Sequence, residues 1–167
     1  MDARTASEPA PVKNVTTVER KSDRELVVTR TFNGPARLVY EAWTKPELLK
    51  RWWAPKSLGV PLLSCEADVR VGGSYRMVFG QDASESMAFH GKYLEVTPHS
   101  RLVWTNEEGG GEAITTVTFE EKGGKTLLVL TERHPSKEAA DEGAGFGEGL
   151  RETFGQLDEL LVALGAS

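Results

Sequence analysis

The sequence predicts a two-layer α+β domain, in which a curved antiparallel sheet wraps around one long C-terminal helix. Two observations carry this prediction. After residue 61, apolar residues alternate with a period of two in short stretches joined by Gly-Gly turns at 72–73 and 123–124, as in antiparallel strands. Over residues 146–164, apolar residues recur at steps of three and four, which is the stripe of an amphipathic helix. Burying the two apolar faces against each other gives this fold.

The N-terminal part of the chain predicts a tail, one strand and two short helices. Residues 1–22 are small, polar and proline-containing, so we expect a disordered tail, unless its valines pair onto a sheet edge. Glu25–Phe32 is rich in β-branched residues and predicts the first strand. Pro35 and Pro46 each begin a short helix, because proline suits the first helical position. The folded domain is expected over residues 23–165.

The remainder of the chain predicts the rest of the sheet and the terminal helix. Six more strands are expected, at Leu62–Val69, Ser74–Gly80, Met87–Thr97, Arg101–Glu107, Ala113–Lys122 and Lys125–Arg133. Their connections are too short for parallel crossovers, so we expect an antiparallel meander of six or seven strands. The glycine-rich stretch 143–149 leaves two interpretations open. It is either an irregular loop before a helix that begins near Glu148, or an easily frayed first turn that gates a cavity.

The composition argues against several classes of protein. The 20 basic residues are scattered among 25 acidic ones, with a net charge of -5, which argues against a nucleic-acid partner. No apolar run approaches the roughly 20 residues of a membrane span, and the N-terminus lacks the apolar segment of a secretory signal. Cys65 is the single cysteine, which excludes an internal disulfide and fits a reducing cytoplasm. We therefore expect a cytoplasmic protein with one domain.

Several short motifs carry a family resemblance. They are Trp52-Trp53-Ala54-Pro55 after the helix start at Pro46, then Asp68-Val69-Arg70-Val71-Gly72-Gly73-Ser74-Tyr75, His90-Gly91-Lys92-Tyr93 and Arg101-Leu102-Val103-Trp104-Thr105. With these motifs the chain resembles the START-like, helix-grip superfamily (SRPBCC) over about residues 25–164. Within it, the chain is similar to small bacterial proteins named for the C-terminal domain of the activator of the heat-shock-protein-ninety ATPase.

The resemblance implies a helix-grip fold with a deep cavity between the terminal helix and the sheet. Relatives use this cavity to hold lipids, hormones or polyketides; some are cyclases or aromatases, and one branch is a co-chaperone. This sequence departs from the family pattern at Ala54, where glycine is common, and at Asn106, where an aromatic residue is expected. The glycine-rich stretch 143–149 is a third departure. Asn106 is expected to enlarge or polarise the cavity.

Aromatic and apolar side chains are the expected ligand-binding residues. They are Trp52, Trp53, Tyr75, Met77, Phe79, Phe89, Tyr93, Trp104, Phe119, Phe146, Leu150 and Phe154. Ligand pockets are mostly apolar with a few placed polar groups, although the same side chains, tightly packed, would also make a solid core. Trp52 and Trp53 face different surroundings, since neighbouring helix positions lie about 100° apart. We expect Trp52 to be the packing anchor and Trp53 to lie nearer the opening of the cavity.

No catalytic or metal site is indicated. The three histidines are dispersed and no nucleophile motif or zinc spacing accompanies them. His99 lies in a turn and is expected to be solvated, whereas His90 and His134 are each either surface residues or cavity residues. Glu95 and Glu132 sit in strands, and the pattern does not choose between an inward and an outward direction for them.

The sequence therefore favours a protein that binds a small hydrophobic or aromatic molecule, without cofactor or metal and with its oligomeric state open. A cyclase or aromatase that uses polar cavity residues such as Tyr75, His90, Tyr93 or Glu132 is the first alternative. A co-chaperone-like interaction module is the second, and it would need an exposed apolar patch. Only about 22 polar residues precede Arg24, which leaves no room here for the separate N-terminal domain of that branch.

Overall fold

The computed structural model describes residues 15–82, 85–107 and 112–165, which form one antiparallel sheet and a set of helices. The strands are β1 (Thr17–Arg20), β2 (Glu25–Phe32), β3 (Leu62–Ala67), β4 (Ser74–Asp82), β5 (Glu85–Thr97), β6 (Arg101–Asn106), β7 (Ala113–Lys122) and β8 (Lys125–Arg133). The helices are α2 (Ala36–Thr44), α3 (Pro46–Trp52) and α4 (Lys137–Ala163), with a 3₁₀ turn at Lys56–Leu58.

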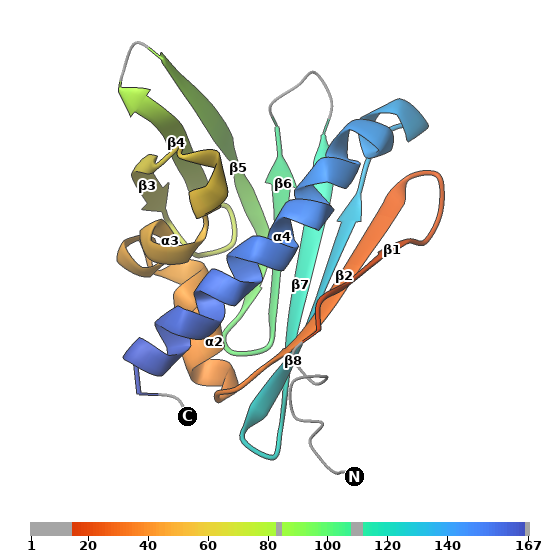
Figure 1. The fold of residues 1–167 in the computed structure, drawn as a ribbon. Coiled ribbons are helices and arrows are strands. Elements are labelled where there is room, and N and C mark those ends of the chain that lie inside the picture. Colours follow the sequence, from red (N-terminus) through yellow and green to blue (C-terminus); the bar gives the residue numbers. More distant parts are fainter. Residues whose placement is uncertain (1–14, 83–84, 108–111, 166–167) are drawn as a thin grey trace, which may run out of the picture.

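The eight strands form one sheet in the order β1-β2-β8-β7-β6-β5-β4-β3. Figure 1 shows α4 running diagonally across one face of this sheet, with α3 packed beside it near β3, and α2 contacts β7 and β8. We call the face toward α4 the inner face. This arrangement confirms the α+β helix-grip prediction, with a long C-terminal helix and two short helices that follow Glu25–Phe32.

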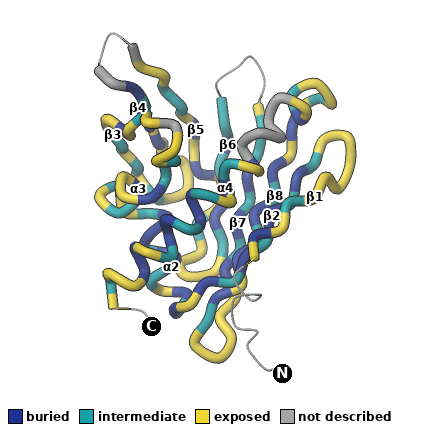
Figure 2. Tube along the Cα trace, in the orientation of Figure 1, coloured by how far each residue is buried: buried dark blue, intermediate teal, exposed yellow. Residues whose placement is uncertain are grey.

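Alternation along the strands separates the inner face from the solvent. In β2 every second residue from Leu26 is buried, and the register places Leu26, Val28 and Phe32 opposite Glu132, Leu130 and Thr126 of β8. Figure 2 shows the buried stretches gathered where α2 and the sheet face α4. In β4 the same alternation buries Tyr75 and Met77 and exposes Ser74 and Arg76.

For Thr17–Arg20 the expected disordered tail is wrong, and the alternative, in which a valine of this segment pairs onto a sheet edge, is confirmed at Val18. Thr17–Arg20 form β1, which pairs antiparallel with β2 at the sheet edge, so the sheet has eight strands rather than six or seven. Val18, opposite Val28, is partly buried and packs on the core. This burial offsets the entropic cost of ordering the segment. Residues 1–14 lie outside the described part of the chain.

The predicted start of the terminal helix near Glu148 is also wrong. Helix α4 has 27 residues and begins at Lys137, where the Ser136 hydroxyl accepts a hydrogen bond of 3.1 Å from the Ala139 amide. This N-cap supplies a partner for one of the free donors at the helix start. The helix therefore runs through the glycine-rich stretch, and the interpretation of that stretch as an irregular loop does not hold.

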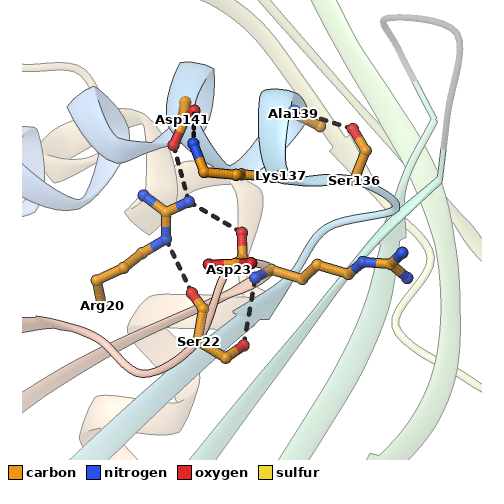
Figure 3. Close-up of polar contacts among 8 residues, drawn as sticks. Arg20, Ser22, Asp23, Ser136, Lys137, Ala139 and Asp141 are labelled. Atoms are coloured by element: carbon orange, nitrogen blue, oxygen red, sulfur yellow. Dashed lines mark hydrogen bonds and ion pairs between the residues drawn. The ribbon is translucent and has the colours of Figure 1, made fainter.

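Tertiary contacts stabilise this glycine-rich half of α4. Figure 3 shows Arg20, at the end of β1, reaching Asp141 on α4 at 2.8 Å and the carbonyl oxygen of Asp23 at 2.9 Å. Gly147 allows a close approach, because a Cβ there would lie 2.7 Å from Leu26 Cδ2. The edge strand and the start of α4 are thus held together, which offsets the low helix propensity of glycine.

Candidate functional site

The two adjacent tryptophans face different surroundings, as the sequence indicated. Trp52 is fully buried, and its indole N–H donates to the carbonyl oxygen of Ala42 at 2.9 Å. Trp53 is only partly buried and packs against the core. The prediction that Trp52 is the packing anchor is confirmed. The place of Trp53 relative to a cavity opening stays a prediction.

Side chains of α4 hold the segment that follows Trp53. The Gln156 amide donates to the carbonyl oxygens of Trp52 and Ala54, both at 2.9 Å, and its oxygen accepts from the Lys56 amide at 2.9 Å. One turn earlier, the Glu152 carboxylate accepts from both the amide and the hydroxyl of Ser57. The Gln156 bonds hold the segment after the tryptophans against α4, and the hydrogen bonds from the Ser57 hydroxyl and amide hold the pKa of the Glu152 carboxyl below its usual value.

Trp43 of α2 lies at the centre of an aromatic cluster. Five other rings lie within 6.4 Å of its ring, centroid to centroid: Trp52, Trp53, Trp104, Phe119 and Phe154. Trp43 is 3% exposed, yet its Nε1 has no hydrogen-bond partner among the described residues. Sequence reasoning assigned Trp43 only to the apolar stripe of its helix, and its unpaired indole N–H left no mark in the sequence.

The structure brings together most of the predicted ligand-binding residues. The fully or nearly fully buried ones are Trp52, Tyr75, Met77, Tyr93, Phe119, Leu150 and Phe154. The partly buried ones are Trp53, Phe79, Phe89 and Trp104. Phe146 belongs to α4, but its side chain lies outside the described residues. Whether these residues bind a ligand stays a prediction.

A line of polar groups crosses the inner face beside this cluster. The single hydrogen of the Tyr75 hydroxyl is shared between two acceptors, Thr105 O at 2.8 Å and Asn106 Oδ1 at 2.9 Å, and Asn106 Nδ2 donates to Thr115 Oγ1 at 2.8 Å. We call Tyr75, Asn106 and Thr115 the polar line; it joins β4, β6 and β7. Gly91 makes it possible, since a Cβ there would lie 2.8 Å from the Tyr75 ring and 1.8 Å from Thr105 O.

Glu132 and His134 form a buried pair at the end of β8. Their side chains are each 9% exposed, and Glu132 Oε1 lies 2.8 Å from His134 Nε2. Glu132 is opposite Thr115 in the sheet register, so the pair continues the polar line toward the edge of the inner face. Of the two carboxylates whose direction the sequence left open, Glu132 points inward, whereas Glu95 is exposed and pairs with Arg101 at 3.1 Å.

Burial disfavours the ionised form of two further titratable groups among the described residues, Cys65 and Tyr93. Burial raises the pKa of the Cys65 thiol to about 11, so the thiol stays protonated near neutral pH. Burial also raises the pKa of Tyr93. His90 and His99 are exposed, and His90 pairs in register with the exposed Arg76. The alternative in which His90 lines the cavity is therefore wrong, and the solvated state expected for His99 is confirmed.

Two other kinds of feature, a metal site and a membrane-spanning helix, are absent from the described residues. No group of three or more histidine, cysteine, aspartate or glutamate side chains in this part of the chain could hold a metal ion. No helix within the same residues has the length and apolar character that crossing a bilayer requires.

A shallow hollow of about 260 Å³ lies at β3 and β4, with Glu66, Asp68 and Arg76 among its lining residues. No residue of α4 lines this hollow.

Solved structures with the same fold are numerous. Protein NE0264 from Nitrosomonas europaea is 29% identical, with a TM-score of 0.76 over 89% of this chain and all of that one. A protein from Rhodobacter sphaeroides is 24% identical, with a TM-score of 0.81 over 89% of this chain and 99% of its own. CalU16 from Micromonospora echinospora is 21% identical, with a TM-score of 0.61 over 83% of this chain and 81% of its own. The last two likenesses concern the fold alone.

Sequence comparison identifies the family. No curated protein matches the chain. The model of the family described as "Activator of Hsp90 ATPase homolog 1-like protein" matches residues 33–162, which is most of the chain and includes the two tryptophans, the polar line and most of α4. The chain therefore belongs to the family of activator of Hsp90 ATPase homolog 1-like proteins.

Proposed function

We propose that this protein binds a small hydrophobic or aromatic molecule, lipid-like or polyketide-like, between α4 and the inner face of the sheet. The observation that carries the proposal is the polar line, which lies beside an aromatic cluster on a buried face. A core that only had to fill space would favour apolar side chains there, because buried polar groups need partners. Ligand sites, by contrast, combine apolar walls with a few placed polar groups.

The placement of α4 is consistent with a site on the inner face. The α4 backbone approaches β2, α2 and α3 most closely, and it stays further from β4, β5 and β6. The aromatic side chains on these three more distant strands are Tyr75, Phe79, Phe89, Tyr93 and Trp104. Three of them, Phe79, Phe89 and Trp104, are only partly buried, and with Trp53 they are the proposed ligand contacts.

The proposal is tested on the protein as purified. Native mass spectrometry should show an added mass that is lost on denaturation, and a library of hydrophobic metabolites should contain compounds that raise the melting temperature. Trp104→Leu should weaken binding of such a compound at least tenfold. The control Leu94→Ala, at an exposed position of β5, should leave it unchanged. A ligand-free spectrum together with no thermal shift across the library contradicts the proposal.

A second candidate function is acid–base catalysis of the cyclase or aromatase type. The observation that favours it is the Glu132–His134 pair, because a carboxylate bonded to an imidazole is a common way to orient a general base. Glu132→Gln and His134→Gln should then abolish turnover of a bound polyketide-like substrate and leave its binding within about threefold. Equal losses of binding and turnover would instead assign the pair to binding.

The free cysteine bears on the location of the protein, and the exposed apolar side chains bear on its partners. We propose a cytoplasmic location, because the single cysteine, Cys65, is free and only partly buried. A co-chaperone-like role has less support. The exposed large apolar side chains of the described residues are spread over several elements, and only Met87 and Leu94 share a strand: Val15, Leu63, Val71, Met87, Leu94, Leu127 and Val162.

A further inference from the structure

We propose that Trp43 is a ligand-binding residue, whose indole N–H donates a hydrogen bond to a carbonyl oxygen of the bound molecule. The ligand is then an aromatic ketone or a related oxygenated ring compound rather than a plain hydrocarbon. This inference rests on the proposed binding function and adds the chemical class of the ligand.

The unpaired donor is the first step of the argument. Trp43 is 3% exposed, and no acceptor among the described residues reaches its Nε1. Buried donors are nearly always paired, and buried tryptophans usually find a partner for the indole N–H. An orphaned donor in the middle of a well-packed cluster is therefore a feature that needs an explanation.

Trp52 provides an internal comparison. It belongs to the same cluster, with its ring 5.0 Å from that of Trp43. Its own N–H is satisfied by the carbonyl oxygen of Ala42 at 2.9 Å. This segment of the chain therefore supplies an acceptor for one buried indole and none for its neighbour. The asymmetry points to an acceptor outside the described residues, which we assign to the bound molecule.

The rings around Trp43 indicate what kind of molecule brings this acceptor. Trp52, Phe119 and Phe154 are buried, whereas Trp53 and Trp104 are only partly buried. A flat ring compound that covers Trp53 and Trp104 would complete the burial of both, and we assign the missing acceptor to a carbonyl group on its rim. An apolar compound of the same shape would leave the donor unpaired.

A contact of the N–H with a ring face is the competing explanation. The Trp43 ring meets those of Trp53 and Phe119 at 76° and 79°, which is the geometry of edge-to-face pairs. Such contacts are weak compared with a bond to oxygen. They also predict no change at the Trp43 N–H when a carbonyl compound replaces a hydrocarbon of the same shape, so the two explanations are separable.

The experiment compares 2-acetylnaphthalene with 2-ethylnaphthalene, which differ in one carbonyl oxygen. The chain has four tryptophans, so a ¹⁵N–¹H spectrum of the protein shows four indole signals, assigned by triple-resonance methods. We expect 2-acetylnaphthalene to bind about fivefold to tenfold more tightly. It should shift the Trp43 indole proton downfield, and 2-ethylnaphthalene should not. The Trp52 indole, already bonded to Ala42, should move little with either compound.

Two variants test the same point through an affinity ratio. Trp43→Phe keeps a ring and removes the N–H, so it should reduce the preference for the acetyl compound to about one, whatever packing it disturbs. Trp53→Phe, at a partly buried neighbour, should keep the preference. If Trp43→Phe does not fold, the wild-type spectra decide alone.

The outcomes separate the two proposals. Equal affinities for the two naphthalenes, or identical shifts of the Trp43 signal, overturn the role of Trp43 and leave the binding function standing. Binding of neither compound up to its solubility limit overturns the aromatic-ketone class, and the metabolite library then decides the binding function by itself. A tighter acetyl compound with a downfield Trp43 signal supports both.

Discussion

Gln156 of α4 and Trp52 of α3 are joined by a hydrogen bond of 2.9 Å, from the glutamine side-chain amide to the tryptophan carbonyl oxygen. The same side chain also bonds Ala54 and Lys56. A single buried amide thus fixes the backbone on both sides of the sequence Trp53-Ala54-Pro55, and it does so from the helix that covers the inner face.

Replacing this amide should destabilise the protein substantially. Gln156→Leu removes three hydrogen bonds and leaves buried backbone groups without partners, so we expect a loss of about 2–3 kcal/mol in the free energy of unfolding. Urea denaturation at pH 7 measures it. Glu159→Gln is the control on the same helix, because its exposed side chain makes only a 3.9 Å ion pair with Lys56. A loss below about 1 kcal/mol for Gln156→Leu would show that water replaces these bonds.

The neighbouring Glu152 should give the protein an acid-sensitive contact. Hydrogen bonds from Ser57 lower the pKa of its carboxyl in the folded state. A lowered pKa means that the carboxylate stabilises the fold above its unfolded pKa of about 4.3, and that this stabilisation is lost as the pH falls through the folded pKa. Glu152→Gln should therefore lower the urea midpoint at pH 7, and the gap from the wild type should shrink below pH 4. A gap that stays constant with pH would exclude the ionised form as the cause.

Two glycines of α4, two residues apart, should respond in opposite directions to alanine. At Gly149 a Cβ meets nothing within 4 Å, whereas at Gly147 it would lie 2.7 Å from Leu26 Cδ2 and 3.1 Å from Val18 Cγ1. Alanine has the higher helix propensity, so Gly149→Ala should stabilise the protein by about 0.5–1 kcal/mol. In Gly147→Ala, overpacking should cancel the gain in helix propensity and lower the free energy of unfolding by a further amount of about 1 kcal/mol. Thermal melts of both variants check this. A stabilised Gly147→Ala would mean that Leu26 and Val18 move aside at little cost.

Arg30 should be among the most sensitive positions of the inner face. Its side chain is 4% exposed and forms an ion pair with Asp158 of α4, and its Nη1 donates to Thr16 Oγ1 at 3.1 Å. Arg30→Met leaves the partly buried carboxylate unpaired and should cost about 3 kcal/mol.

The dependence on pH identifies the mechanism of this loss. Burial already raises the pKa of Asp158 despite Arg30, so its ionised form is disfavoured in the folded protein and stability falls as the pH rises through the folded pKa. The loss in Arg30→Met should accordingly be larger at pH 7 than at pH 4. In Arg30→Met/Asp158→Leu the total loss should be smaller than the sum of the single losses. Additive losses would show that the two charges do not interact.

Local patterns predicted the strands well and the boundaries of α4 poorly. Ala113–Lys122 and Lys125–Arg133 were expected with the bounds that the structure shows, because period-two alternation and the glycine turn between them both arise from neighbouring residues. The start of α4 at Lys137 depends on the Ser136 cap and on the contact of Gly147 with Leu26. The close approach of Gly147 to Leu26 is a tertiary feature, which the local sequence does not reveal. Helix propensity alone argued against a helix through the glycine-rich stretch 143–149.

The candidate site was predictable only in part, again because tertiary contacts leave no local pattern in the sequence. The aromatic residues could be named from composition and alternation, and Asn106 stood out as a departure from the family pattern. The inward direction of Glu132 is set by its register with Thr115 on β7 and Leu26 on β2. The missing partner of the Trp43 indole depends on how six rings pack together. Neither the direction of Glu132 nor the missing partner of the Trp43 indole can be recognised from a sequence pattern.

The neighbours β2 and β8 have a consequence for how the chain is made. Glu25 pairs with Arg133 and Phe32 with Thr126, so this pairing, next to the β1 edge of the sheet, joins segments that are far apart in the sequence. Contacts of such long range are slow to form, since loop closure must precede them. During synthesis the sheet cannot close until β8 has left the ribosome. Until then β2 carries an unpaired edge, and this is the stage at which the nascent chain is most exposed to aggregation.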